Sequence, residues 1–203
     1  MKRPNPAPDG EFGRSGRFLS NPPVAIIPDF LDSALCRRVQ IAMDLGVVEP
    51  AEILEDGPAL DREARRASII EVDPATLAAV EARLDAARDG LSASCGVPLG
   101  RREGAGFIRY SHGGFYRPHR DRTHDADWPG AAERRIAVVV FLNAGFEGGE
   151  LMIYPESDHD TPARITPHPG SLVAFDAARL HEVRPVTGGT RDVIVDWFYA
   201  PEG

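Results

Sequence analysis

The chain has 203 residues, a formal net charge of −8 and 27% charged side chains, and its length suits one domain with a proper core. The acidic balance disfavours a general nucleic-acid binder, although it leaves room for a small basic groove. No apolar run reaches the length of about eighteen residues that a membrane span needs, and the N-terminus lacks the apolar core of a secretory signal. Cys36 and Cys95 lie far apart in helix-like segments, so we expect free thiols in a reducing cytoplasm.

The first half of the chain alternates polar connections with short apolar segments. Residues 1–22 are rich in Pro, Gly, Arg and Ser, so we predict a flexible lead-in. A short strand over 24–27 precedes a helix capped by Asp32 or Ser33. Residues 47–67 carry clustered charges interrupted by Pro and Gly, which predicts a surface loop and permits a lid over a site.

A second helix and a series of short strands follow. Residues 68–72 predict a strand, and Asp73-Pro74 opens a helix whose apolar stripe continues to about Ser94. From Gly104 onward, we expect eight short strands over 106–110, 116–121, 135–143, 150–154, 163–166, 171–175, 182–186 and 191–199. This order predicts an α+β fold, mainly β, with a double-stranded β-helix (jelly-roll, cupin-like) core backed by N-terminal helices. No boundary is expected inside 23–203, because neither the helices nor the strands could bury their apolar faces alone.

Two histidines, an aspartate and an arginine in the strand-rich half carry the chemistry. His119 and Asp121 are two residues apart, so their side chains project from the same face of a strand. With His181 alongside, they would form a two-histidine, one-carboxylate set, which leaves three positions open on a ferrous ion and is typical of non-haem iron oxygenases. Arg191 would then hold a dicarboxylate co-substrate on the metal. An isolated His-x-Asp pair is more often a surface feature, so the prediction depends on the four residues together.

Two further histidines compete for these roles. His124 is close enough in sequence to be a rival ligand or a substrate contact. His168 is restricted by prolines on both sides and has no arginine ten positions later, which makes it a weaker alternative to His181.

Five segments resemble the prolyl-4-hydroxylase-like family of 2-oxoglutarate dioxygenases, in the family's order and spacing. They are 109–121 (RYSHGGFYRPHRD), 135–143 (RIAVVVFLN), 147–151 (EGGEL), 169–175 (PGSLVAF) and 181–191 (HEVRPVTGGTR). All lie within about 104–200, the motif-bearing core of the domain that we expect over 23–203. The resemblance implies a jelly roll that uses Fe(II), 2-oxoglutarate and O2, with ascorbate as the reductant.

Carried over position by position, the resemblance implies His119, Asp121 and His181 as the iron ligands. It also implies that Arg191 forms a salt bridge with the distal carboxylate of 2-oxoglutarate, and Tyr110 matches a tyrosine whose hydroxyl reaches that same carboxylate. An arginine suits this role because its guanidinium makes two parallel charge-assisted bonds to a carboxylate.

Substrate contacts are less closely defined by the resemblance. Tyr116 matches an aromatic residue on the substrate side of the family's site. Arg134 falls where some prolyl hydroxylases hold a substrate-contacting arginine, and Arg135 is the competing choice. His124 remains a further candidate from its position in the chain.

The resulting hypothesis is an Fe(II)- and 2-oxoglutarate-dependent dioxygenase that hydroxylates an unactivated C–H bond and releases succinate and CO2. Asp121 favours hydroxylation, because related halogenases have a small residue in its place. We favour a prolyl residue of a protein or peptide as substrate, with a free amino acid or small metabolite as the alternative. An alternative of a different class is a non-catalytic jelly-roll sensor of metal or 2-oxoglutarate. The oligomeric state is left open.

Overall fold

The computed structural model describes residues 11–12, 16–51, 53–54, 58–59, 63–123, 129–157 and 160–202. These residues contain the helices α1 (Ser33–Leu45), α2 (Pro74–Cys95) and α3 (Pro129–Glu133). Asp32, not Ser33, caps α1, because its carboxylate accepts the N–H groups of Ala34 and Leu35. None of the described helices is long and apolar enough to cross a membrane.

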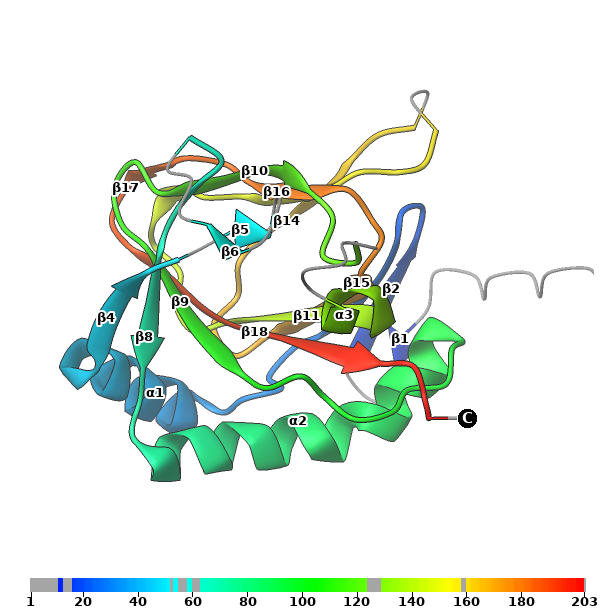
Figure 1. The fold of residues 1–203 in the computed structure, drawn as a ribbon, viewed down its shortest axis with the longest axis horizontal. Helices are drawn as coiled ribbons and strands as arrows, with labels where there is room; N and C mark the ends of the chain where they lie inside the picture. Colours follow the sequence, from blue (N-terminus) through cyan, green and yellow to red (C-terminus); the bar gives the residue numbers. More distant parts are fainter. Residues whose placement is uncertain are drawn as a thin grey trace, which may run out of the picture.

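Two antiparallel sheets form the body of the protein (Figure 1). The large sheet has the order β1 (Glu11–Phe12), β2 (Gly16–Ser20), β3 (Pro23–Ile27), β15 (Leu172–Asp176), β11 (Arg134–Phe141), β18 (Arg191–Tyr199), β9 (Gly106–Tyr110), β8 (Ser68–Glu71) and β4 (Val47–Pro50). The small sheet has the order β14 (Ala163–Ile165), β13 (Leu151–Ile153), β16 (His181–Val183), β10 (Phe115–His119) and β7 (Arg65–Arg66). Two short pairs, β12 (Glu147–Gly148) with β17 (Val186–Gly188) and β5 (Ile53–Leu54) with β6 (Pro58–Ala59), complete the strands.

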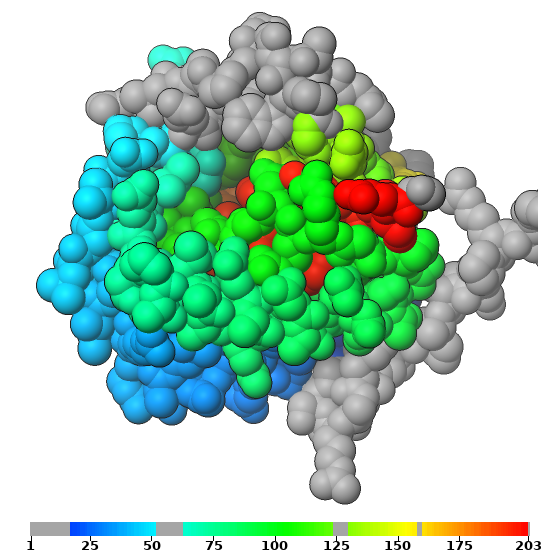
Figure 2. Space-filling model, turned by 60° about the horizontal axis from the view of Figure 1, so that its bottom comes forward, coloured from blue at the N-terminus to red at the C-terminus, as the bar shows by residue number. Residues whose placement is uncertain are grey.

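The protein is layered as helices, large sheet and small sheet, and Figure 2 shows α2 across the near face with α1 beside it. Alternate side chains of the central strands enter two apolar clusters, since successive strand residues point to opposite faces. One cluster joins the helices to the large sheet and includes Val39, Val80, Leu84, Val138 and Ile194. The other lies between the sheets and includes Val139, Phe141, Leu151, Val183 and Val193. Burial on both faces explains why β11 is apolar almost throughout.

The predicted fold class is confirmed, and each of the eight predicted strands coincides with a strand whose ends differ by a few residues. Both cysteines are free, as expected, and burial raises the pKa of Cys95 to about 11. The strands of the large sheet are connected so that the sequence-distant segments β3, β15 and β11 lie side by side.

Two predictions about the N-terminal half need correction. The lead-in predicted over 1–22 is too long, because β2 pairs with β3 and Phe18 enters the helix-side cluster. The loop predicted over 47–67 begins with strand β4, which pairs with β8 at the sheet edge while its valines stay exposed. Residues 52, 55–57 and 60–62 of that loop lie outside the described residues, so the predicted lid stays a prediction.

Candidate metal centre

A cavity of about 850 Å³ opens between the two sheets. Its walls include Ile69, Leu151, Val183 and Val193, which are apolar, and the cluster between the sheets surrounds it. The four residues predicted to carry the chemistry all border this cavity: His119, Asp121, His181 and Arg191.

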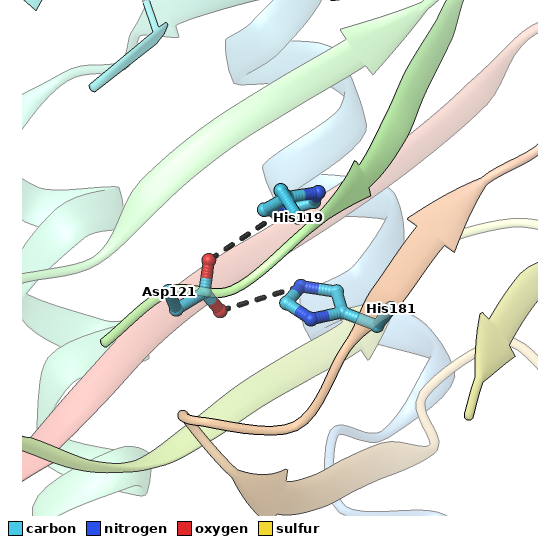
Figure 3. A group of neighbouring side chains, drawn as sticks. All are labelled: His119, Asp121 and His181. Carbon is cyan, nitrogen blue, oxygen red and sulfur yellow. Dashed lines mark ion pairs between the residues drawn. The ribbon is translucent and has the colours of Figure 1, made fainter. Parts of the chain in front are cut away.

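Strands β10 and β16 bring the two histidines together, because His119 and His181 are paired in register. Strand β10 ends at His119, so the prediction that Asp121 shares a strand face with His119 is wrong: Asp121 lies in the bend that follows the strand. Figure 3 shows its carboxylate facing both imidazoles. Asp121 Oδ1 is 3.5 Å from His119 Nε2, and Asp121 Oδ2 is 3.4 Å from His181 Nε2 (Figure 3). One ligand atom from each residue lies within 4.8 Å of the others, a spacing that fits one metal ion.

Backbone carbonyls fix the orientation of both imidazole rings. His119 Nδ1 donates to the carbonyl of Arg117 at 2.8 Å, and His181 Nδ1 donates to the carbonyl of Arg179 at 2.9 Å. The proton on Nδ1 leaves the Nε2 lone pair free and aimed at the shared point. The ring of His119 is further held by Tyr116, which stacks on it with the ring centroids 3.4 Å apart.

The protonation states of His181 and Asp121 are those that a cation needs. Burial, and next the neighbouring His119, lower the pKa of His181 to about 4. Burial would raise the pKa of Asp121, but the facing imidazoles of His181 and His119 outweigh it and hold that pKa well below its usual range. At neutral pH the site therefore offers an unprotonated imidazole nitrogen of His181 and the ionised carboxylate of Asp121.

Arg191 is buried in the cavity wall, and no carboxylate of the described residues forms an ion pair with it. It is 1% exposed, and its Nε has no hydrogen-bond partner among the described residues. Its neighbour Asp192 points to the other face of β18, where Arg109 binds it at 2.8 Å. The guanidinium instead lies over Tyr110 and Phe141, 5.0 and 5.2 Å from the ring centroids. Burial lowers the pKa of Arg191 to about 10. An unpaired buried cation of this kind is a binding site for an anion.

The sequence of residues 105–199 matches the 2OG-Fe(II) oxygenase superfamily, and the match contains the whole constellation. These residues are therefore similar in sequence to that superfamily. The chain is 38% identical over 97 residues to a PKHD-type hydroxylase of Stenotrophomonas maltophilia (strain K279a). That alignment covers 45% of this chain and 40% of the relative, so the chain spans less than half of the relative's length.

Solved structures share the fold of this chain. A Pseudomonas putida prolyl-4-hydroxylase superposes with a TM-score of 0.70 at 24% identity, covering 90% of this chain and 95% of the other. A prolyl hydroxylase from Trichoplax adhaerens, determined with a hypoxia-inducible-factor peptide fragment, gives 0.69 at 22% identity, covering 87% and 83%. The arrangement of strands is therefore that of prolyl hydroxylase-like oxygenases.

The remaining predicted residues occupy different positions around the cavity. Tyr110 and Tyr116 both line it, and burial raises the pKa of the Tyr116 hydroxyl. Arg134 lines it too, but Arg135 does not, because the pairing of β11 with β18 shifts register between Arg134 and Ile136. His124 lies outside the described residues.

The environment of Arg134 favours a role in holding Asp121 over the predicted substrate contact. Its guanidinium donates two hydrogen bonds to the carboxylate of Glu103, each at 2.5 Å. The Cζ of Arg134 lies 3.8 Å from the centroid of the Trp197 ring. Its third nitrogen donates to the carbonyl of Asp121 at 3.1 Å. The large sheet thus fixes the backbone of Asp121, one of the three predicted metal ligands.

Two supporting residues were not predicted from sequence. Asn143 binds the backbone on both sides of Arg191, donating to the carbonyl of Thr190 at 2.7 Å and accepting the N–H of Asp192 at 3.0 Å. Gly149 has a φ of +64°, and a β-carbon there would lie 3.2 Å from Arg191 Cδ. Both residues lie in segments that resemble the family, 135–143 and 147–151, but only the folded structure shows that they lie beside Arg191.

Proposed function

We propose that the protein is an Fe(II)- and 2-oxoglutarate-dependent hydroxylase that acts on an unactivated C–H bond, with a prolyl residue of a peptide or protein as its substrate. One observation carries the proposal: a two-histidine, one-aspartate cluster and an unpaired buried guanidinium border the same cavity. The two features require different partners, a divalent cation and a carboxylate, and 2-oxoglutarate with iron supplies both.

The donor set fits ferrous iron, because imidazole nitrogen and carboxylate oxygen suit this ion and three protein ligands leave positions for other molecules. His119, Asp121 and His181 would hold the metal. Arg191 would hold the distal carboxylate of 2-oxoglutarate, with Tyr110 beneath it. When bound, this pair supplies the oxidant that inserts one oxygen atom of O2 into a C–H bond, with succinate and CO2 as products.

The protein's own contribution is orientation and exclusion of water. The carbonyls of Arg117 and Arg179 fix the imidazole tautomers, so both Nε2 atoms stay available for the metal. The apolar walls keep water away from the reacting carbon. The rigid fork of Arg191 sets the direction from which the co-substrate reaches the cluster.

The prolyl substrate is supported by the relatives. The Trichoplax protein is described with a peptide bound, and the Pseudomonas protein is described as a prolyl-4-hydroxylase. A free amino acid or small metabolite is the alternative, since a cavity of about 850 Å³ also suits a small molecule. Ascorbate is expected to sustain turnover by keeping the iron reduced.

A spectroscopic titration tests the assignment before any substrate is known. Under anaerobic conditions, Fe(II) followed by 2-oxoglutarate should produce a weak visible charge-transfer band in the wild type. Asp121→Ala should lose the band and the tight binding of Fe(II). His112→Ala is the matched control for His119→Ala, because His112 lies in the turn between β9 and β10, is exposed and is not among the residues that line the cavity. It should behave as the wild type, whereas His119→Ala should not.

Turnover is then measured as succinate release and as a gain of one oxygen atom in peptides that contain proline, with iron, ascorbate and 2-oxoglutarate present. A library of free amino acids run in parallel tests the alternative substrate class. Succinate release that persists in Asp121→Ala at the wild-type rate would contradict the ligand assignment.

A further inference from the structure

The lining of the cavity is rich in arginine although the chain as a whole is acidic. The cavity is bordered by Arg65, Arg117, Arg120, Arg122, Arg134 and Arg191. Among the described residues, the carboxylates on its walls are Glu63 and Asp121. With a net charge of −8 on the whole chain, this concentration of cations is local to the site.

Three of these arginines have identified partners or roles. Arg134 is bound by Glu103, and Arg122 reaches Asp176 at 3.0 Å. Arg191 faces the co-substrate position. Their charges are therefore committed to structure or to 2-oxoglutarate.

Two further arginines of the lining, both exposed, form what we call the arginine rim: Arg117 and Arg120. Arg117 is exposed and makes no ion pair with a carboxylate in the described part of the chain. Arg120 is also exposed and donates only to a backbone oxygen, that of Ala178. Arg65 lies over the ring of Tyr116, 4.6 Å from its centroid.

Backbone hydrogen bonds connect the arginine rim to the predicted metal ligands. The carbonyl of Arg117 accepts the hydrogen bond from His119 Nδ1, and the N–H of Arg117 donates to Ala64 of the neighbouring chain segment at 2.9 Å. Arg65 is paired opposite Tyr116 in the register of β7 with β10. Arg117 is two residues before His119 in β10 and borders the same cavity, so a substrate that extends from the proposed metal position along the cavity wall would meet it.

Cations clustered at a cavity with low-dielectric walls attract anions and raise their local concentration. A guanidinium is the side chain best shaped to bind a carboxylate through two parallel bonds. Because Arg117 and Arg120 are exposed in the lining of the cavity, a molecule that reaches them must extend outward from the metal. A peptide meets this requirement better than a single amino acid.

We propose that the substrate is an acidic peptide, in which an aspartate or glutamate next to the hydroxylated residue binds the arginine rim, chiefly through Arg117. This inference rests on the proposed function and adds the charge of the substrate to it. It also accounts for an exposed arginine beside a metal cluster in a protein whose surface otherwise repels anions.

The test uses three fluorescent peptides that share one central proline and alanine spacers and differ only in the flanking residues, which are Glu, Gln or Lys. Binding to the full chain is measured by anisotropy at low and high salt. The Glu peptide should bind about tenfold or more tightly than the Gln peptide, and the Lys peptide should bind worst. The preference should shrink as salt rises.

Arg117→Gln should remove most of this preference, and Arg117→Lys should keep part of it. Arg88→Gln is the matched control, because Arg88 is an exposed arginine of α2 away from the cavity, and it should bind as the wild type does. Equal binding of the Glu and Lys peptides by the wild type, or an unchanged preference in Arg117→Gln, overturns the inference.

Turnover separates this inference from the proposed function. Hydroxylation of prolyl peptides regardless of charge would leave the function standing and refute the arginine rim as a specificity site. Charge-selective, Arg117-dependent binding without oxygenation of any peptide would support the rim and count against the proposed reaction. Succinate release stimulated only by free amino acids would refute the peptide class.

Discussion

Replacing Arg191 with methionine should stabilise the unliganded protein while abolishing its response to 2-oxoglutarate. The guanidinium is 1% exposed and has an unpartnered Nε, so the folded protein carries an uncompensated buried charge. Methionine preserves most of the side-chain volume against Tyr110 and Phe141 and removes the charge.

The magnitude follows from the lowered pKa of Arg191. At about 1.4 kcal/mol for each pKa unit, the gap between its ordinary value of 12.5 and about 10 corresponds to about 3 kcal/mol of unfavourable burial. The cation–π contacts with Tyr110 and Phe141 offset about 1–2 kcal/mol of this. Arg191→Met should therefore raise the free energy of unfolding by about 1–2 kcal/mol, or the melting temperature by about 2–8 °C.

The assay is denaturant unfolding of the apoprotein, followed by thermal unfolding with metal and 2-oxoglutarate. Co-substrate at a hundredfold its dissociation constant should stabilise the wild type by about 2.7 kcal/mol and the variant by nothing. Arg164→Met, at a 70% exposed side chain, is the control and should change neither quantity appreciably. Destabilisation of the variant by more than about 2 kcal/mol would show that Arg191 is well paired in the apoprotein and would refute this reasoning.

Two further substitutions test the support around the site. Arg102→Met should lower the free energy of unfolding by about 3 kcal/mol, because it leaves the fully buried carboxylate of Asp196 without its cation. Adding Asp196→Asn should restore most of that stability in denaturant unfolding. Additive effects of the two substitutions would contradict the pairing. Gly149→Ala should weaken 2-oxoglutarate binding measured by calorimetry, because its β-carbon presses on Arg191 and its φ of +64° disfavours alanine. Gly90→Ala, where a β-carbon meets nothing within 4 Å, is the matched control and should stabilise α2 with unchanged binding.

The parts of the fold that could be predicted are those with local signals. Asp73 before Pro74 defines the start of α2, and the strict alternation over 191–199 defines β18 to the residue. The spacing of His119 and Asp121, together with His181 and Arg191, indicated the constellation because the family's order and spacing are preserved around them. These signals act over short stretches of chain, where backbone geometry alone decides which side chains share a face.

The parts that could not be predicted depend on residues brought together from far apart. Asp196 needs a partner beneath the helices, and Arg102 provides it from a segment with no regular pattern. Glu103 engages Arg134 in the same way, which changes the interpretation of that arginine. Strand β2 was missed because its few apolar residues lie among polar ones, and only pairing with β3 makes the segment ordered.

In the proposed reaction, the metal site and the site for the distal carboxylate of 2-oxoglutarate lie on different sheets. Their separation therefore depends on contacts between the two sheets. The small sheet contributes the paired His119 and His181, whereas the large sheet contributes Arg191 opposite Tyr110. Packed sheets are about 10 Å apart, a gap that a dicarboxylate can bridge only if the separation is fixed. Arg134 fixes it by donating from the large sheet to the carbonyl of Asp121, at the point where the chain leaves β10. The site is therefore a product of sheet packing, and weakening that cross-link should impair metal and co-substrate binding together.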